Sequence, residues 1–374
     1  MSLAGTGLVA LGLYLCVLVV LTLLARRASL RTPSEFYLGG RDLAFFVLFF
    51  TLYATTYSGN SLLGYPGEAY RRGFSWVMST GFMMAIMVVF LLLAPRLRRA
   101  SEEHHLVSPG DYIRLRYGNT ALVRLIGAIQ ALALTQFLLA QLIAMGHVAA
   151  GLTGGAIPYA AGVIGLAAVI LIYETLGGLR AVAFTDAFQG LLLLFGLIAM
   201  LVWLLERSGG MAGVTGWILM NEPSLATVPS GDECRNWASS LLLLGVGSVV
   251  YPQTIQRIYA ARSKQTLYRS LALMAWMPLV TVFVVTLVGI AALPMLAGLG
   301  EIGADEVMPM VIRNWADQGG VHVVLATLVF IGALAAIMST ADSVLLSLGS
   351  VISEDVVGSD RYDPRTTRQG KLAA

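Results

Sequence analysis

The sequence predicts an all-α integral membrane protein, and three observations support this fold class. Hydrophobic residues make up 57% of the 374 residues and charged residues only 12%, whereas soluble domains carry roughly 25% charged residues. The mean hydropathy is +0.78, and the apolar residues gather in runs that suit spans of about 20 residues. We therefore expect a single multi-pass domain in the lipid bilayer of the plasma membrane. The small net charge of +3 argues against nucleic acid as a partner.

About nine apolar runs are long enough to cross a bilayer. Short polar connections separate them. The first run leads directly into Arg26 and Arg27 and lacks a basic leader, which favours a true span over a cleavable signal peptide. The predicted spans are residues 7–25, 43–67, 74–95, 121–151, 157–174, 187–205, 238–256, 270–294 and 320–350.

The basic residues predict the orientation, because Lys and Arg accumulate on the cytoplasmic side during insertion. An N-terminus outside the cell places 19 of the 24 basic residues, among them Arg180, Arg257 and Lys264, in inner loops and the C-terminal tail. The five that stay on the outer side are Arg71, Arg72, Arg207, Arg235 and Arg313. We therefore expect the N-terminus outside and the C-terminal tail inside.

Two of the predicted spans contain polar stretches with glycine that disfavour a continuous helix. One stretch runs from Ala54 to Ser61; the other runs from Gly245 to Ser248 and is followed by Tyr251-Pro252-Gln253. Irregular backbone at membrane depth is tolerated only where it is buried in protein or lines a cavity. A pair of interrupted helices is typical of transporters with inverted repeats. The alternative is close helix packing, which Gly and Ser also permit.

Four stretches, in order along the chain, resemble the sodium:solute symporter family. They are residues 38–41 (LGGR), 177–189 (GGLRAVAFTDAFQ), 256–261 (QRIYAA) and 334–340 (LAAIMST). The resemblance implies a core of five helices repeated in inverted orientation after one extra N-terminal helix. On that map 7–25 is the extra helix, 43–205 is the first repeat, 238–350 is an incomplete second repeat, and 351–374 is a cytoplasmic tail or the start of a further helix.

The resemblance also implies a function. Members of this family are secondary active transporters that couple inward sodium movement to uptake of a small organic solute by alternating access. No nucleophile, base and orienting group recur together in the sequence, so catalysis has no support. Three alternatives stay open: a proton-coupled symporter, a transporter-like sensor domain of a signalling protein, and a passive channel. The oligomeric state also stays open.

Residues 336–340 supply oxygen atoms at a spacing that suits sodium, a hard cation that prefers oxygen ligands. Side chains at positions i+3 and i+4 of a helix lean back toward the carbonyl at i. The hydroxyls of Ser339 and Thr340 should therefore cluster near the Ala336 carbonyl. The family pattern adds the carbonyls of Ala54 and Tyr57 from the first interrupted helix. The competing interpretation is that both hydroxyls only bond back to their own helix.

Asp186 and Asp342 are candidates for a possible second cation site, because an ionised Asp well inside the bilayer costs ~2.5–3.5 kcal/mol on insertion scales. Asp342 lies about one turn beyond Ser339, and the predicted span directions place Asp186 at a similar depth. Some relatives hold a second sodium with the acid corresponding to Asp186 and the hydroxyls corresponding to Ser339 and Ser343. Those relatives have serine where this chain has Asp342, which leaves the ion number and the choice between Na⁺ and H⁺ open. Asp186 can also act as a helix N-cap, with Gln189 completing a capping box.

Candidate substrate-binding side chains are polar residues on the two interrupted helices and on the 121–151 span. Each of them can instead form a hydrogen bond between helices. The predicted pocket contains no evident arginine, so organic acids, amino acids, vitamins and sugars all stay open as substrates. The candidates are Thr56, Ser58, Ser61, Gln136, Tyr251 and Gln253.

Overall fold

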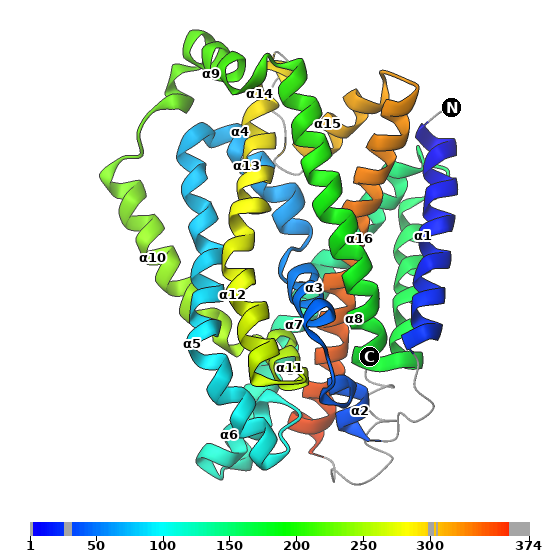
Figure 1. Cartoon of the computed structure of the whole chain (residues 1–374), viewed down its shortest axis with the longest axis vertical. Helices are drawn as coiled ribbons and strands as arrows, with labels where there is room; N and C mark the ends of the chain where they lie inside the picture. Colours follow the sequence, from blue (N-terminus) through cyan, green and yellow to red (C-terminus); the bar gives the residue numbers. More distant parts are fainter. Residues whose placement is uncertain (1–2, 26–31, 298–302, 304–305, 359–374) are drawn as a thin grey trace.

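A computed structural model describes residues 3–25, 32–297, 303 and 306–358, and within these ranges the chain is almost entirely helical (Figure 1). The α-helices are α1 (Leu3–Ala25), α2 (Pro33–Leu38), α3 (Phe45–Thr56), α4 (Tyr65–Arg72), α5 (Thr80–His104), α6 (Pro109–Tyr117), α7 (Thr120–Leu152), α8 (Tyr159–Arg207), α9 (Gly210–Asn221), α10 (Gly231–Gly247), α11 (Pro252–Ala260), α12 (Lys264–Val280), α13 (Val282–Ala291), α14 (Leu293–Leu296), α15 (Val307–Ala316) and α16 (Val321–Ser350). Short 3₁₀ or π segments are η1 (Gly39–Arg41), η2 (Asn60–Gly64), η3 (Gly73–Ser79), η4 (Pro223–Ala226), η5 (Ser248–Val250) and η7 (Val351–Val357).

Six helical stretches of the described residues are long and apolar enough to cross a membrane, and a seventh is formed if the bent pair of α10 and α11 counts as one span. The predicted all-α membrane class is therefore confirmed. The prediction of nine spans is not confirmed by this tally. Part of the difference lies in α8, which joins the predicted spans 157–174 and 187–205 in one helical assignment of 49 residues.

Gly178 bends α8 sharply. Its φ of 54° and ψ of −154° are not helical, and the limbs before and after it run in opposite directions along the long axis of the molecule (Figure 1). A Cβ atom at this position would lie 2.4 Å from the Phe36 carbonyl oxygen, so both the backbone conformation and the contact with α2 require glycine. The prediction that Asp186 caps a helix N-terminus is wrong, because Asp186 lies inside the second limb of α8.

The first interrupted helix is confirmed within the predicted stretch. Helix α3 ends at Thr56, and Tyr57 has φ −97° and ψ 97°, which is extended backbone. The chain becomes helical again with the π turn η2 and then α4. Gly59 sits in this break, where a Cβ atom would lie 3.2 Å from Ile337 of α16. The break therefore packs directly against α16.

The second interrupted helix is confirmed as well. Helices α10 and α11 are bent by 60° at their junction. Pro252 is the first residue of α11, a position where its missing N–H leaves no helical hydrogen bond unmade. Two backbone hydrogen bonds, Leu43 N to Ala260 O and Arg262 N to Leu43 O, both 3.1 Å, join the end of this helix to the chain that leads into α3. The two interrupted helices are thus tied together at the end of the molecule that carries α6.

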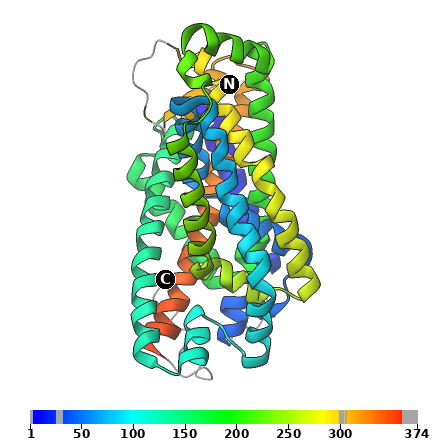
Figure 2. The ribbon, with the colours of Figure 1, turned by 90° about the vertical axis from the view of Figure 1, so that its left-hand side faces the viewer.

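Helix α16 forms the centre of the bundle. Every residue from Val329 to Ser350 is buried, and α8 and α7 cover much of its surface. Figure 2 shows α5 lying between α10 and α12, and α5 contacts both of these helices. Because α16 is buried along most of its length, its polar side chains need partners inside the protein.

Candidate functional site

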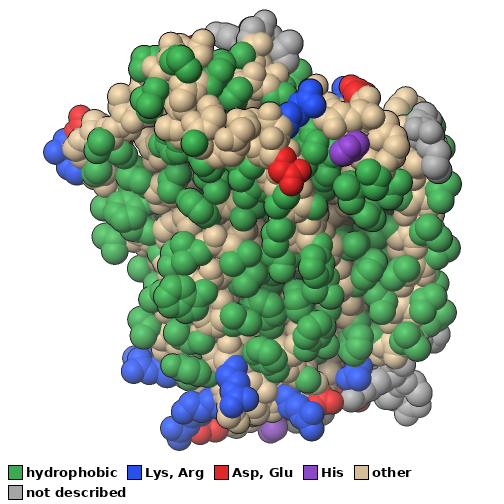
Figure 3. All heavy atoms as spheres, turned by 45° about the horizontal axis from the view of Figure 1, so that its top comes forward, with side chains coloured by type: hydrophobic (Ala, Val, Ile, Leu, Met, Phe, Trp, Pro, Cys, Tyr) green, Lys and Arg blue, Asp and Glu red, His purple; other side chains and the backbone are tan. Residues whose placement is uncertain are grey.

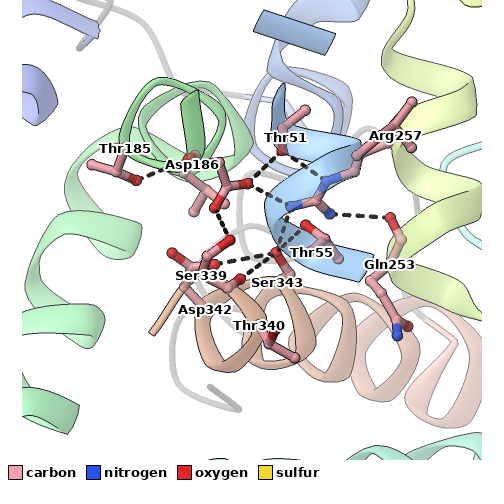
Figure 4. Close-up of polar contacts among 12 residues, drawn as sticks. Thr51, Thr55, Thr185, Asp186, Gln253, Arg257, Ser339, Thr340, Asp342 and Ser343 are labelled. Atoms are coloured by element: carbon pink, nitrogen blue, oxygen red, sulfur yellow. Dashed lines mark hydrogen bonds and ion pairs between the residues drawn. The ribbon is translucent and has the colours of Figure 1, made fainter. Parts of the chain in front are cut away.

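Four helices bring charged and hydroxyl side chains to one buried point (Figure 4). Thr51 comes from α3, Asp186 from α8, Arg257 from α11, and Ser339 and Ser343 from α16. All five side chains are fully buried. Two of the contributing helices, α3 and α11, belong to the interrupted pairs. The polar centre therefore lies between the two interrupted helices, α8 and the central helix.

Asp186 has its negative charge compensated within this centre. Its Oδ2 atom accepts a hydrogen bond from Arg257 Nη2 at 3.0 Å and another from the Thr51 hydroxyl. Its Oδ1 atom accepts from Ser339 Oγ at 2.5 Å. Pairing with Arg257 and hydrogen bonding to both oxygens are the conditions under which an ionised carboxylate persists in a membrane interior.

Arg257 is the residue that the sequence analysis placed wrongly. Its position at the end of an apolar run predicted an inner loop, but the guanidinium is buried and points into the bundle. Besides Asp186, it donates to Thr51 Oγ1 at 2.8 Å, to the Gln253 carbonyl at 3.1 Å and to Ser343 Oγ at 2.5 Å. The sequence analysis, which saw no evident arginine in the predicted substrate pocket, did not anticipate an arginine beside the predicted cation ligands. The one signal in the sequence was Asp186 itself, because a membrane-embedded acid is expected to have a partner.

Asp342 has a different environment. It is fully buried and accepts a hydrogen bond from the Tyr173 hydroxyl. Ser343 Oγ lies 3.2 Å from its Oδ1 atom. Within the described residues it forms no ion pair. Asp186 and Asp342 thus meet through Ser339 and Ser343, but only Asp186 has a cationic partner.

The predicted sodium ligands lie at the contact between α3 and α16. Thr340 Oγ1 donates to the Ala336 carbonyl oxygen at 3.1 Å, a contact that is compatible with both the sodium-site expectation and the competing back-bonding interpretation. Ala54 and Tyr57 are at the end of α3, where the last carbonyls of a helix lack helical partners. A contact of 2.9 Å between Thr55 Oγ1 and Ser343 Oγ joins the two helices one turn away. The five predicted ligands are thus on neighbouring elements, and Ser339 additionally donates to Asp186.

The predicted substrate residues do not form one group. On the first interrupted helix, Thr56 Oγ1 donates to the Leu52 carbonyl, while Ser58 and Ser61 are buried. On α7, Gln136 is exposed. None of these predicted side chains lines the large cavity described below.

The second interrupted helix places its two candidates differently. Tyr251 is 44% exposed at the bend. Gln253 is buried, and its Oε1 atom has no hydrogen-bond partner among the described residues. Its backbone carbonyl accepts from Arg257. Gln253 therefore contacts the charged centre through its backbone carbonyl.

A cavity of about 850 Å³ opens beside the first helix break, at the end of the molecule away from α6. Its walls come from η2, α7, α15 and α16. Asn60 and Gln141 line it, and the Gln141 side-chain oxygen accepts from the Gly59 backbone N–H at 3.3 Å. The sequence analysis missed both residues because each is one of several polar positions on its helix, and only the fold shows which ones face the cavity.

Two interrupted helices around a buried polar centre, with a cavity at one break, are the architecture of a membrane transporter. Comparison with known proteins agrees. A model of the sodium:solute symporter family matches residues 36–365. The sodium/pantothenate symporter of Escherichia coli (strain K12) is 26% identical over 348 residues, covering 91% of this chain and 70% of that protein. The high-affinity proline transporter of Bacillus subtilis (strain 168) is 28% identical over 338 residues, covering 86% and 68%.

The fold is also found among solved structures. A structure described as the substrate-bound outward-open state of a Na⁺-coupled sialic acid symporter has a TM-score of 0.82 at 18% identity, covering 98% of this chain and 78% of that one. The chain belongs to the sodium:solute symporter family. Membership makes it a secondary transporter that couples solute uptake to sodium, and not an enzyme.

Proposed function

We propose that this protein drives uptake of a small organic solute with sodium bound between the first helix break and α16, by alternating access. The observation that carries the proposal is the position of the Tyr57 break against the segment from Ala336 to Thr340. Sodium would be held by the carbonyls of Ala54, Tyr57 and Ala336 and the hydroxyls of Ser339 and Thr340. Oxygen ligands from a broken helix and from hydroxyls are the donor set that suits this ion.

We also propose a second cation site beside Asp342. Asp186, Ser339, Asp342 and Ser343 are the candidate ligands, and Arg257 already neutralises Asp186. Asp342 is the member of this set with a buried carboxylate and no basic partner in the described part of the chain. A monovalent cation there would offset its charge.

The proposed orientation puts the N-terminus outside and the tail inside. Lys and Arg gather at the end with α2 and α6, along the lower edge of Figure 3, and a broad hydrophobic surface lies above them. Because basic residues favour the cytoplasmic side, the cavity beside the first break would open outward. With the limbs of α8 counted separately and each interrupted helix counted once, the chain would cross the membrane nine times. The map of an extra helix at 7–25, a first repeat at 43–205 and a partial second repeat at 238–350 is part of this proposal.

Uptake measurements test the sodium site. In cells or vesicles that carry the protein, concentrative uptake should require Na⁺ and fail in potassium-based buffer at fixed pH. Ser339→Ala and Thr340→Ala should each raise the sodium concentration for half-maximal uptake by about 10-fold or more, as expected for loss of one ligand worth ~1.4 kcal/mol. Uptake that follows a pH gradient and ignores sodium would favour the proton-coupled alternative.

Thr327→Ala is the matched control for Thr340→Ala. Both threonines lie on α16, both are buried, and both donate to the carbonyl four residues earlier, at 2.7 Å for Thr327 and 3.1 Å for Thr340. Only Thr340 is beside the break. Equal sodium dependence in the Thr340→Ala and Thr327→Ala variants would contradict the proposed site.

A further inference from the structure

The cavity beside the first helix break is lined by polar side chains at two heights along α7. Its floor is near Gln141, whose side chain bonds to the Gly59 N–H in the break. His147 lies six residues further along α7 and also lines the cavity, about 9 Å higher at 1.5 Å per residue. Between these levels α7 contributes the apolar side chains of Ile143 and Ala144 to the wall.

The upper level carries two opposite charges on one helix. Glu306 is the N-cap of α15 and Arg313 lies seven residues later, so the two are two turns apart on the same side, about 10 Å along the axis. Both line the cavity. The Glu306 carboxylate accepts a hydrogen bond from the Gly303 N–H at 3.3 Å, and the Arg313 side chain has no ion-pair or hydrogen-bond partner among the residues described.

Arg313 is therefore a guanidinium available to a ligand. It is exposed and lies in the wall of this open cavity. A guanidinium presents parallel N–H donors that match a carboxylate in a bidentate contact. A single arginine balances a single negative charge, whereas Glu306 on the same wall disfavours a ligand of higher negative charge. The contact that α15 offers to a solute thus suits a single carboxylate group.

We propose that Arg313 is a specificity-determining residue that recruits a solute with one carboxylate group into this cavity. This inference rests on the proposed transport function, because it names the substrate class of the same cavity. The carboxylate contacts Arg313 at the upper level, and the uncharged part of the solute lies along the apolar wall toward the amides of Gln141 and Asn60. Loss of the guanidinium removes a charged hydrogen-bond partner, which weakens binding of a carboxylate by about 10- to 100-fold.

The test uses thermal stabilisation of the purified full chain in the presence of Na⁺. The probes are L-proline and pantothenate, the primary amide of each, a set of other small monocarboxylates, and neutral sugars. We expect at least one carboxylate to stabilise the wild type and its amide to do so far less. Arg313→Gln should abolish this preference, Arg313→Lys should retain part of it because the charge remains, and Glu306→Gln should keep or strengthen it.

Arg207→Gln is the matched control. Arg207 is an exposed arginine on the predicted outer side and is not among the residues that line the cavity, so its loss should leave the affinity for the carboxylate unchanged. Stabilisation by neutral sugars but by no carboxylate, equal binding of acid and amide, or an unchanged preference in Arg313→Gln would each overturn the inference. Thermal stabilisation by Na⁺ without solute tests the sodium site separately. If Na⁺ stabilises no variant and not the wild type, the proposed sodium site is wrong, whereas the role of Arg313 is judged from the comparison of each acid with its amide.

Discussion

The buried pair of Asp186 and Arg257 is the interaction whose loss we expect to destabilise this protein most. Both side chains are fully buried, and Arg257 Nη2 lies 3.0 Å from Asp186 Oδ2. Removing one member leaves the other charge uncompensated, which costs ~3–5 kcal/mol. Whole domains are stable by only ~5–15 kcal/mol. A single substitution here should therefore remove a large part of the free energy of unfolding.

Two single variants and the double variant distinguish the interaction energy of the ion pair from the contribution of each side chain to the free energy of unfolding. Arg257→Gln and Asp186→Asn should each lower the free energy of unfolding by ~3–5 kcal/mol. The double variant should be clearly more stable than the sum of these losses predicts, because no unpaired charge remains. Arg257→Lys should be intermediate, since an ammonium keeps the charge but cannot also reach Thr51 and Ser343 as the guanidinium does.

Equilibrium unfolding of the purified protein in detergent, followed by intrinsic fluorescence, measures these differences. Arg235→Gln is the control, because Arg235 pairs with Asp232 and both side chains are 78% exposed; its stability should match the wild type. The reasoning is refuted if Arg257→Gln is no less stable than Arg235→Gln, or if the double variant loses the full sum of the single losses.

Two further predictions address the bend in α8 and the orientation. Gly178→Ala should lower the free energy of unfolding by about 2 kcal/mol or more, because the backbone conformation alone costs ~1–3 kcal/mol for a residue other than glycine and a Cβ atom would lie 2.4 Å from the Phe36 carbonyl oxygen. The control is Gly165→Ala on the same helix, where nothing lies within 4 Å and no loss of stability is expected. Equal losses in the two variants would contradict the argument. Cys234 is exposed and should react with a membrane-impermeant maleimide on intact cells, whereas a cysteine replacing the exposed Lys264 in a Cys234→Ser background should react only after permeabilisation; the reverse pattern would invert the orientation.

The interrupted helices could be predicted from sequence because their causes are local. Pro252 lacks an N–H, and Gly59 and the hydroxyl residues around it weaken a helix at a known place. The cluster of Ala336 and Thr340 is likewise a consequence of helical spacing within one segment. Each of these features depends on residues fewer than ten positions apart, so the two breaks and the contact between Ala336 and Thr340 lie where the sequence placed them.

The charged centre could be predicted only in part because its members come from distant segments. Asp186 and Arg257 are 71 positions apart, and the apolar run before Arg257 gave no sign that its side chain turns inward. The same holds for Gln136 and Gln141 on α7: five positions apart, they differ by more than a quarter turn, so one is exposed and the other lines the cavity. Only the packing of α7 against the break and α16 decides between them.

Ser339 connects the proposed ion site to the charged centre. A serine hydroxyl can donate one hydrogen bond and has two lone pairs, and the Ser339 hydroxyl donates its hydrogen bond to Asp186 Oδ1 at 2.5 Å. Its lone pairs are then oriented for a cation, in the way that an outer carboxylate fixes an inner ligand. Arg257, from the second interrupted helix, keeps Asp186 available as the acceptor. We therefore expect Asp186→Asn to weaken sodium binding although Ser339 is unchanged, and an unaltered sodium affinity in that variant would show that the two sites are independent.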